Sequence, residues 1–352
     1  MTGKLVFNDG TVYKGVSFGA EKATPGEIVF STGMVGYPES LTDPSYAGQI
    51  LVMTYPLVGN YGIPKSSFWE SEKMQIAGLV VCNYIDTPYH FQSEKTLGAW
   101  LKESGVPALE IKDTRQMALK IRDEGVQLGK IIFEGQDVDI TDPNAGNLAA
   151  QVSLQGVNIL NEGGSKTVVV FDCGVKNNII KNLVDRNLRV IRVPWDYDIF
   201  SLEEKFDGLL ISNGPGDPKT AVKTIESVKK ALEMKIPIFG ICLGNQILGL
   251  AAGGDTYKLK FGHRSQNQPC IMAGTKRCYL TTQNHGYAIG DMPEGFKPWF
   301  INANDGTNEG IIHESLPFMS VQFHPEATPG PSDTEWLFDM FAEKIGAQPL
   351  HS

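Results

Sequence analysis

The sequence predicts an α/β fold for the second half of the chain and a mostly β fold for the first half. After residue 166, short apolar segments rich in β-branched residues alternate with segments whose apolar residues recur at helical spacing. Before that point, apolar residues alternate with polar ones, and turns rich in Gly and Pro are frequent. Strands interleaved with helices predict a mostly parallel sheet, with its ligand beyond the carboxyl ends of the strands.

The length of 352 residues suits two domains, each large enough to bury its own core. The stretch 158–166 is polar and rich in glycine, so we expect it to be the linker between an N-terminal domain at 1–157 and a C-terminal domain at 167–347. In the N-terminal domain, helices are expected at 93–104 and 113–124. The second of these has Asp113 or Thr114 as a candidate N-cap.

The C-terminal domain contains most of the regular alternation. Its expected elements are strand 167–172, helix 176–186, strand 188–195, strand 208–212, helix 220–234 and strand 236–241. No internal repeat or low-complexity segment interrupts this order.

The composition argues against several classes of protein. A net charge of −9 without any basic run argues against nucleic-acid binding. There is no apolar stretch of membrane-spanning length and no signal peptide, so we expect no membrane association and a cytoplasmic location, or the mitochondrial matrix or a plastid if a transit peptide has been removed. The five cysteines show no C-x-x-C pairing, so neither a disulfide framework nor a metal site is expected.

Cys242 lies between an apolar strand and a segment of helical spacing, with Gly240 and Gly244 two residues to either side. This pattern predicts a tight strand-to-helix turn that exposes a nucleophile, with sulfur in place of the serine oxygen of G-x-S-x-G. The free N–H groups and the dipole of a helix N-terminus favour the thiolate. A buried core cysteine is the alternative, but a plain core strand gains nothing from the two glycines.

A base for this thiol is available near the end of the chain. The apolar segment 318–323 is followed by His324, Pro325 and Glu326, and the proline prevents the strand from continuing. His324 is therefore expected at a strand tip, where sheet enzymes place catalytic groups. Glu326 can hold the imidazole in one tautomer, which completes a set of nucleophile, base and orienting group.

A third motif, Asn213-Gly-Pro-Gly-Asp-Pro218, follows the strand expected at 208–212. Gly214 and Gly216 allow backbone N–H groups to approach a ligand closely, and the prolines fix the shape of the loop. The loop could cradle a phosphate or stabilise an oxyanion. Because no G-x-x-x-x-G-K-[ST] sequence is present, the oxyanion hole is favoured.

These three motifs, in this order, resemble the class I (triad) glutamine amidotransferases, over about 166–345. The resemblance implies that Cys242 attacks the side-chain carboxamide of L-glutamine and forms a γ-glutamyl thioester. His324 would act as acid and base, and Glu326 would orient it. The backbone N–H groups of Gly214 and Leu243 would form the oxyanion hole, and the products would be glutamate and ammonia.

The first half of the chain resembles the small (glutaminase) subunit of carbamoyl-phosphate synthetase, notably in 26–46, 57–64, 113–115 and 128–130. This resemblance implies a partner, either a separate large subunit or fused synthetase domains. That partner would bind ATP, Mg²⁺ and bicarbonate and would use the ammonia to make carbamoyl phosphate for pyrimidine, arginine or urea synthesis. No cofactor is expected on this chain itself.

The same resemblance implies a set of glutamine-binding residues. They are Ser45, Gly214, Gly216, Leu243, Gln246, Asn284, Gly286 and Tyr287. For Asn284 and Ser45, turn formation is the alternative role. His263 and His285 are not included in the catalytic set, because surface histidines are the larger class.

One residue departs from the family pattern. Many members have His where this chain has Asn245, and Asn also occurs in the ammonia-dependent, urea-cycle branch, whose glutaminase domain has lost its cysteine. This chain keeps Cys242, Gln246, His324 and Glu326, so a working glutaminase is predicted. Two alternatives are a non-catalytic domain, which covalent labelling of Cys242 would exclude, and a cysteine hydrolase acting on another amide, against which Gln246 argues.

Overall fold

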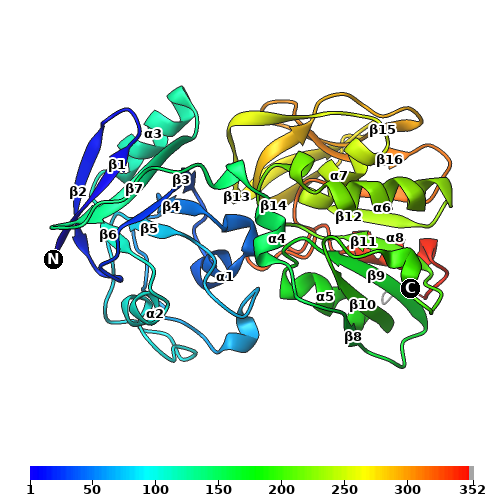
Figure 1. The fold of residues 1–352 in the computed structure, drawn as a ribbon, viewed down its shortest axis with the longest axis horizontal. Coiled ribbons are helices and arrows are strands. Elements are labelled where there is room, and N and C mark those ends of the chain that lie inside the picture. The colour runs from blue at the N-terminus through cyan, green and yellow to red at the C-terminus, as the bar shows by residue number, and fades with distance from the viewer. Residues whose placement is uncertain (349–352) are drawn as a thin grey trace. The chain divides into compact units, whose positions relative to one another are not determined.

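The computed structural model describes residues 1–348, which form two compact units (Figure 1). The first is Met1–Gly146, and the second begins at Asn147. The boundary therefore precedes the linker expected at 158–166. Residues 158–160 form strand β8 (Asn158–Leu160), which pairs antiparallel with β10 (Leu188–Pro194) of the second unit. The polar residues and glycines of 158–166 form an edge strand and its turn and not a linker. The boundary predicted from composition is therefore corrected to the position between Gly146 and Asn147.

The first unit is a closed barrel with strand order β1-β2-β6-β5-β4-β3-β7. Its strands are β1 (Thr2–Phe7), β2 (Val12–Ser17), β3 (Thr24–Ser31), β4 (Gln49–Met53), β5 (Gly78–Val81), β6 (Ala108–Glu110) and β7 (Gln127–Phe133). Neighbours from β3 to β6 are parallel, and the other pairs are antiparallel. The mostly β N-terminal domain is thus confirmed.

Helices and short 3₁₀ turns fill the connections of the barrel. The helices are α1 (Tyr37–Thr42), α2 (Leu97–Glu103) and α3 (Thr114–Glu124), and the 3₁₀ turns are Pro44–Tyr46, Ser66–Phe68 and Pro143–Ala145. Asp113 caps α3 by accepting the N–H of Gln116, as predicted. Helix α2 begins later than expected because Thr96 caps it, accepting the N–H of Ala99.

The second unit is built on a ten-stranded sheet with order β14-β13-β15-β16-β17-β12-β11-β9-β10-β8. Strands β9 (Lys166–Asp172), β10, β11 (Gly208–Ile211), β12 (Ile238–Ile241) and β17 (Phe318–Val321) pair in parallel. Their apolar, β-branched composition follows from burial on both faces. The predicted α/β fold of the C-terminal domain is confirmed.

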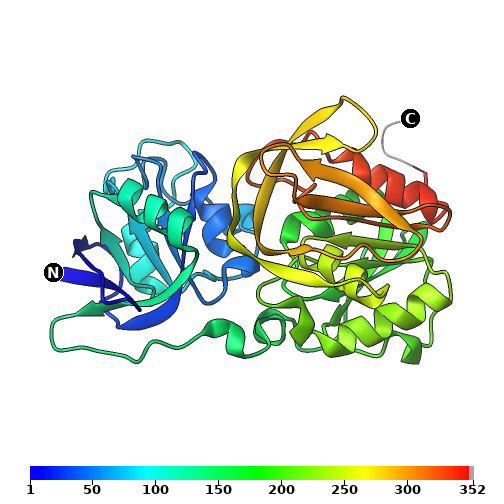
Figure 2. The ribbon, with the colours of Figure 1, turned by 90° about the horizontal axis from the view of Figure 1, so that it is seen from above.

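Helices cover both faces of this parallel region. On one face, α5 (Asn177–Asp185) and α8 (Trp336–Lys344) pack against side chains such as Val168 and Val170. On the other, α6 (Val222–Glu233) and α7 (Leu243–Ala251) pack against Val169 and Phe171. Successive side chains of β9 therefore point alternately into the two hydrophobic cores on either side of the sheet. Figure 2 shows α6 and α8 on opposite sides of the sheet.

Apart from β8, the rest of the sheet is antiparallel and was not predicted as strands. It consists of β13 (Thr256–Met272), β14 (Cys278–Ile289), β15 (Phe296–Asn302) and β16 (Asn308–His313). The remaining elements of this unit are α4 (Leu148–Val152) and the 3₁₀ turns Ile199–Ser201 and Pro218–Thr220. Within residues 1–348, no helix combines the length and hydropathy that spanning a membrane requires.

Candidate active site

Cys242 occupies the tight turn between β12 and α7, and its backbone conformation is unusual for a residue with a side chain. Its φ of 55° and ψ of −103° lie outside the usual regions for a residue with a side chain. Its N–H donates to the carbonyl of Val321 over 2.8 Å, which ties the turn to the neighbouring strand β17. The thiol is buried, with the residue only 2% exposed. The predicted strand-to-helix turn is confirmed.

The glycines beside Cys242 are required by close backbone packing. A Cβ on Gly240 would lie 2.4 Å from the carbonyl oxygen of Gly244. A Cβ on Gly244 would lie 2.1 Å from the carbonyl oxygen of Ile211, at the end of β11. Both distances are far below van der Waals contact. Only glycine therefore allows α7 to begin directly against β11 and β12.

His324 follows the strand that neighbours β12. Ile241 and Val321 are paired in the parallel register, so the residues that follow them emerge at the same edge of the sheet. His324 is anchored there by its own N–H, which donates to the carbonyl of Thr282 over 2.9 Å. Its Nδ1 lies 2.7 Å from Oε1 of Glu326. This contact leaves Nε2, which has no hydrogen-bond partner among residues 1–348, available for chemistry.

Lys176 is a member of this site that the sequence did not reveal. It precedes α5, is 1% exposed, and places Nζ 3.0 Å from Oε1 of Glu326 and 2.6 Å from the carbonyl oxygen of Ala327. A buried ammonium needs such partners. Its only signal in the sequence was a lysine shortly after the carboxyl end of a buried strand, and that signal is weak.

The electrostatics of the site favour an ion pair of imidazolium and carboxylate. Burial by itself raises the pKa of Glu326, but Lys176 and His324 outweigh it and lower the pKa to about 2. Burial lowers the pKa of His324, but Glu326 and Cys242 raise it to about 10. The imidazole therefore holds a proton beside the Cys242 sulfur.

The Gly214 loop lies at the end of β11, next to the start of α7. A Cβ on Gly214 would lie 2.1 Å from the carbonyl oxygen of Cys173 and 2.9 Å from Cδ2 of Leu243. Gly216 has a φ of +90°. Leu243 is the first residue of α7, where a backbone N–H has no partner within the helix. Gly214 and Leu243 are thus brought together beside Cys242.

Strand β14 carries the other predicted glutamine-binding residues of this unit. The Cys242 thiol lies 3.7 Å from the carbonyl oxygen of Asn284, which it approaches as a donor. The Gln246 side chain donates from Nε2 to the carbonyl of Tyr287 over 2.9 Å. Gly286 lies between Asn284 and Tyr287 on the same strand. The family resemblance grouped these residues, although the strand itself was not predicted.

Asn245 is buried in a hydrogen-bond network under the nucleophile. Its Oδ1 accepts from Oγ of Ser320 over 2.8 Å, and its Nδ2 donates to Oε1 of Gln322 over 3.1 Å. The same oxygen of Gln322 accepts from Nε2 of Gln246, also over 3.1 Å. Asn245 is therefore linked to the candidate glutamine-binding residue Gln246 through Gln322, a residue that the sequence did not single out.

Ser45 lies in the first unit, within the 3₁₀ turn Pro44–Tyr46. It is 5% exposed, and its N–H donates to Oδ1 of Asp43 over 2.9 Å. This is the turn chemistry considered as the alternative role. Its part in glutamine binding stays a prediction.

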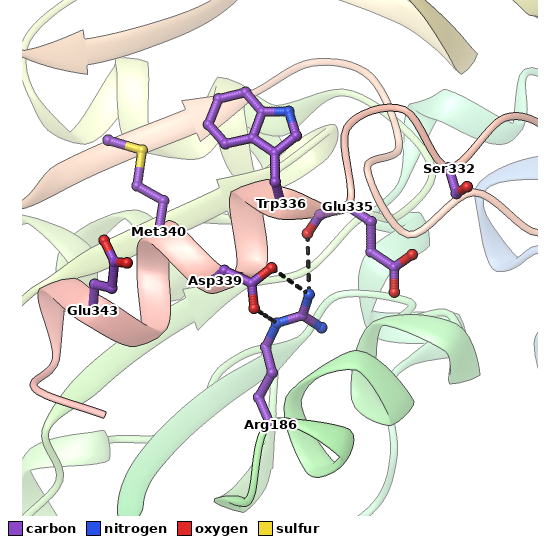
Figure 3. A pocket seen from close by; sticks show the side chains of 7 residues that line it. All are labelled: Arg186, Ser332, Glu335, Trp336, Asp339, Met340 and Glu343. Atoms are coloured by element: carbon purple, nitrogen blue, oxygen red, sulfur yellow. Dashed lines mark hydrogen bonds and ion pairs between the residues drawn. The ribbon is translucent and has the colours of Figure 1, made fainter. Parts of the chain in front are cut away.

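A hollow of about 690 Å³ lies elsewhere in the second unit, beside α8 (Figure 3). Arg186, Glu335, Trp336, Asp339 and Glu343 line it, together with Ser332 and Met340. Arg186 is already held by Asp339, with Nε–Oδ1 at 2.8 Å and Nη2–Oδ2 at 3.0 Å. None of the predicted site residues lines this hollow, so it is not the candidate active site.

Two family models match the chain. Residues 169–344 match the model described as glutamine amidotransferase class-I, and residues 5–131 match the carbamoyl-phosphate synthase small chain, CPSase domain. With the fold and the Cys242 turn described above, these matches show that the chain belongs to the class I glutamine amidotransferases. Its first unit adds the domain of carbamoyl-phosphate synthase small chains.

Curated relatives match nearly the whole chain. It is 50% identical over 98% of its length to "Carbamoyl-phosphate synthase [ammonia], mitochondrial" of Mus musculus, covering 24% of that protein. It is 50% identical over 96% to "Multifunctional protein CAD" of Squalus acanthias, covering 16%, and 46% identical over 99% to "Multifunctional protein pyr1-3" of Dictyostelium discoideum, covering 17%. The chain thus spans a quarter or less of the length of these relatives.

Among solved structures, a putative GMP synthase protein from Thermoplasma acidophilum is similar to part of the chain. The TM-score is 0.44 and the identity 25%, over 51% of this chain and 92% of that one.

Proposed function

We propose that this chain is the glutaminase component of a glutamine-dependent carbamoyl-phosphate synthetase. The observation that carries the proposal is the position of Cys242. It lies on a strained turn at the edge of the sheet where His324 emerges, with Glu326 hydrogen-bonded to the imidazole. A nucleophile, a base and an orienting group are the parts that acyl transfer from an amide requires.

The reaction begins with attack of the Cys242 thiolate on the side-chain carbonyl carbon of glutamine. A C–S bond forms, and the carbonyl oxygen becomes an oxyanion that accepts hydrogen bonds from the N–H groups of Gly214 and Leu243. Such donors typically contribute a few kcal/mol to the stability of the transition state. His324 then donates its proton to the leaving nitrogen, the C–N bond breaks, and ammonia departs.

The second half of the reaction returns the enzyme to its starting state. His324, now neutral, takes a proton from water as the water oxygen attacks the γ-glutamyl thioester. The C–S bond breaks, glutamate leaves, and the thiolate and imidazolium are restored. Glu326 and Lys176 keep the imidazole oriented throughout, because both are buried and bonded to each other.

Substrate binding is assigned to the residues around this turn. Gln246, Asn284, Gly286 and Tyr287 would hold the α-amino and α-carboxyl groups of glutamine, and Ser45 and Gly216 would complete the set. The hydrogen bond from Gln246 to the Tyr287 carbonyl supports this grouping, since it joins α7 to β14.

The ammonia would be used by a synthetase partner, which is either a separate large subunit or further domains of a fused polypeptide. ATP, Mg²⁺ and bicarbonate would bind to that partner, which would make carbamoyl phosphate for pyrimidine, arginine or urea synthesis. The match of residues 5–131 to the carbamoyl-phosphate synthase small chain supports this proposal, as do the long multifunctional relatives. The proposed location is the cytoplasm, or the mitochondrial matrix or a plastid after removal of a transit peptide.

A non-catalytic role is the second candidate, because the mouse relative is named as an ammonia-type synthase and Asn245 also occurs in that branch. The two candidates differ in whether Cys242 reacts. We expect the glutamine analogue diazo-oxo-norleucine to label Cys242 covalently in the presence of the synthetase partner. Cys242→Ser would abolish the label, whereas Cys278→Ser, at an exposed cysteine, would keep it. Unlabelled wild-type protein in the presence of the partner would establish the non-catalytic role.

A further inference from the structure

Two histidines and a glutamate meet inside the second unit, among residues that the glutaminase mechanism does not use. His263 comes from β13, His285 from β14 and Glu309 from β16, and all three are buried. One ligand atom from each lies within 4.8 Å of the others. We call these three residues the His–Glu cluster.

The outer nitrogen of each imidazole has a fixed acceptor. His263 places Nε2 2.9 Å from Oδ2 of Asp305, and His285 places Nδ1 2.9 Å from the carbonyl oxygen of Tyr287. A carbonyl and a carboxylate only accept, so both outer nitrogens carry a proton. This is the outer support that metal-binding histidines usually have, a carboxylate or a backbone carbonyl behind each ring.

The inner nitrogens both face the carboxylate of Glu309, one at each oxygen. His263 Nδ1 lies 3.0 Å from Oε1, and His285 Nε2 lies 3.7 Å from Oε2. The second distance is too long for a hydrogen bond, and Oε2 accepts none from the described residues. A lone pair of His285 therefore points at a buried carboxylate oxygen with nothing positive between them, a costly arrangement in a protein interior.

We propose that the His–Glu cluster binds a divalent transition-metal ion, with Zn²⁺ as the ion that fits best. Two imidazole nitrogens and one carboxylate are a recurrent protein donor set for Zn²⁺. Tetrahedral bonds of about 2.0–2.1 Å place donor atoms roughly 3.3 Å apart. The three donor atoms of the cluster lie within 4.8 Å of one another, so small side-chain movements would close them around an ion. Oε1 of Gln283, 3.3 Å from His285 Nε2, offers a neutral fourth donor.

The ion would tie together three strands beside the candidate glutamine site. His285 follows Asn284, whose carbonyl oxygen contacts the Cys242 thiol. The backbone carbonyl of Glu309 accepts a hydrogen bond from the N–H of Gln322, and the side chain of Gln322 accepts one from Gln246. Metal binding is expected to stiffen this region. The ion's own binding does not depend on glutamine hydrolysis, so the two proposals can fail separately.

The test uses the full chain carrying Cys242→Ser, because a thiol beside an imidazole would itself bind Zn²⁺. Equilibrium dialysis against Zn²⁺ is expected to give one equivalent bound per chain. Glu309→Gln and His263→Gln, each in the same background, are expected to weaken that binding at least tenfold. Glu314→Gln, at an exposed glutamate next to β16, is the matched control and should bind like the parent protein. Circular dichroism checks that each variant is folded.

The visible absorption spectrum of the Cys242→Ser protein loaded with Co²⁺ provides a second measurement, and it leaves the His–Glu cluster unchanged. We expect the visible absorption of a tetrahedral ion without the sulfur-to-metal charge transfer that thiolate ligands produce. Three results would overturn the proposal: no stoichiometric uptake of Zn²⁺, uptake that survives both Glu309→Gln and His263→Gln, or a Co²⁺ spectrum dominated by thiolate.

Discussion

Two buried histidine–glutamate pairs in the second unit use the same residue types in different settings. His324 and Glu326 lie 2.7 Å apart, and His263 and Glu309 lie 3.0 Å apart. Both glutamate side chains are fully buried. The first pair follows a strand that ends beside Cys242, whereas the second joins β13 and β16 in the antiparallel part of the sheet.

The pairs also differ in how the buried carboxylate is compensated. Glu326 is contacted by the ammonium of Lys176 as well as by an imidazole. Within residues 1–348, the only basic side chains within 4.0 Å of the Glu309 carboxylate are the imidazoles of His263 and His285. A carboxylate that already has a fixed cation can orient a base, while one surrounded by imidazoles is arranged to take up a cation. Position in the sheet, more than residue type, therefore separates the two proposed roles.

The largest effect is expected when His324 and His263 are replaced one at a time. His324→Asn is expected to lower kcat/KM for glutamine hydrolysis by about 10³-fold or more, because the base and acid are lost together. His263→Asn is expected to change it far less, since His263 does not contact the reacting groups. Steady-state kinetics of folded protein, measured with the synthetase partner, make this comparison. Equal losses in the two variants would remove the functional distinction between the pairs.

The next largest effect is expected from replacing Lys176, the cation that contacts Glu326 of the first pair. Lys176→Met leaves the Glu326 carboxylate buried with a single partner, so we expect the free energy of unfolding to fall by about 3–5 kcal/mol. Lys181→Met is the matched control on α5. It breaks an exposed pair with Asp185 and should cost less than about 1 kcal/mol. Urea denaturation measures both, and similar losses would show that Lys176 has no special role.

The His324–Glu326 pair also predicts a stability that depends on pH in both directions. The pKa of Glu326 is lowered from 4.5 to about 2, so its contribution is present above pH 4.5 and is lost as the pH falls through 2. The pKa of His324 is raised from 6.5 to about 10, so its contribution is present below pH 6.5 and is lost as the pH rises through 10.

The two groups should therefore add on the order of a few kcal/mol to the free energy of unfolding of the wild-type protein between pH 4.5 and pH 6.5, since each pKa unit corresponds to about 1.4 kcal/mol. Urea unfolding of wild type and of the double variant His324→Asn/Glu326→Gln across this pH range measures the difference. If the double variant shows the same pH profile as wild type, the pair is not the origin of the effect.

The smallest effect is expected at Asn245. Asn245→Ala breaks the hydrogen bonds to Ser320 and Gln322, and the freed Gln322 should hold Gln246 less firmly. We expect KM for glutamine to rise roughly tenfold with a smaller change in kcat, since one or two buried hydrogen bonds are lost. Asn304→Ala, at an exposed asparagine, is the control. A fall in kcat with unchanged KM would instead place Asn245 in the chemical step.

Much of the parallel sheet could be predicted from the sequence. Strands β9 to β12 are short, apolar and β-branched because both of their faces are covered by helices. The antiparallel strands β13 to β16 escaped prediction because polar residues interrupt the apolar pattern of β13 and β14, although turn signals such as Asp305-Gly306 lie between the strands. The predicted linker was wrong for a related reason, since an edge strand such as β8 needs few apolar residues.

The sequence by itself singled out the candidate nucleophile, the candidate base and the glycine-rich loop, because each follows directly from a strand end and its local turn. Cys242, His324 and Gly214 stand out from local pattern alone. Only the tertiary structure placed Lys176 against Glu326, and His263 and His285 around Glu309. Those contacts join residues separated by at least 24 positions along the chain, as with His285 and Glu309. Strand order and side-chain burial decide such contacts, and no local pattern encodes them.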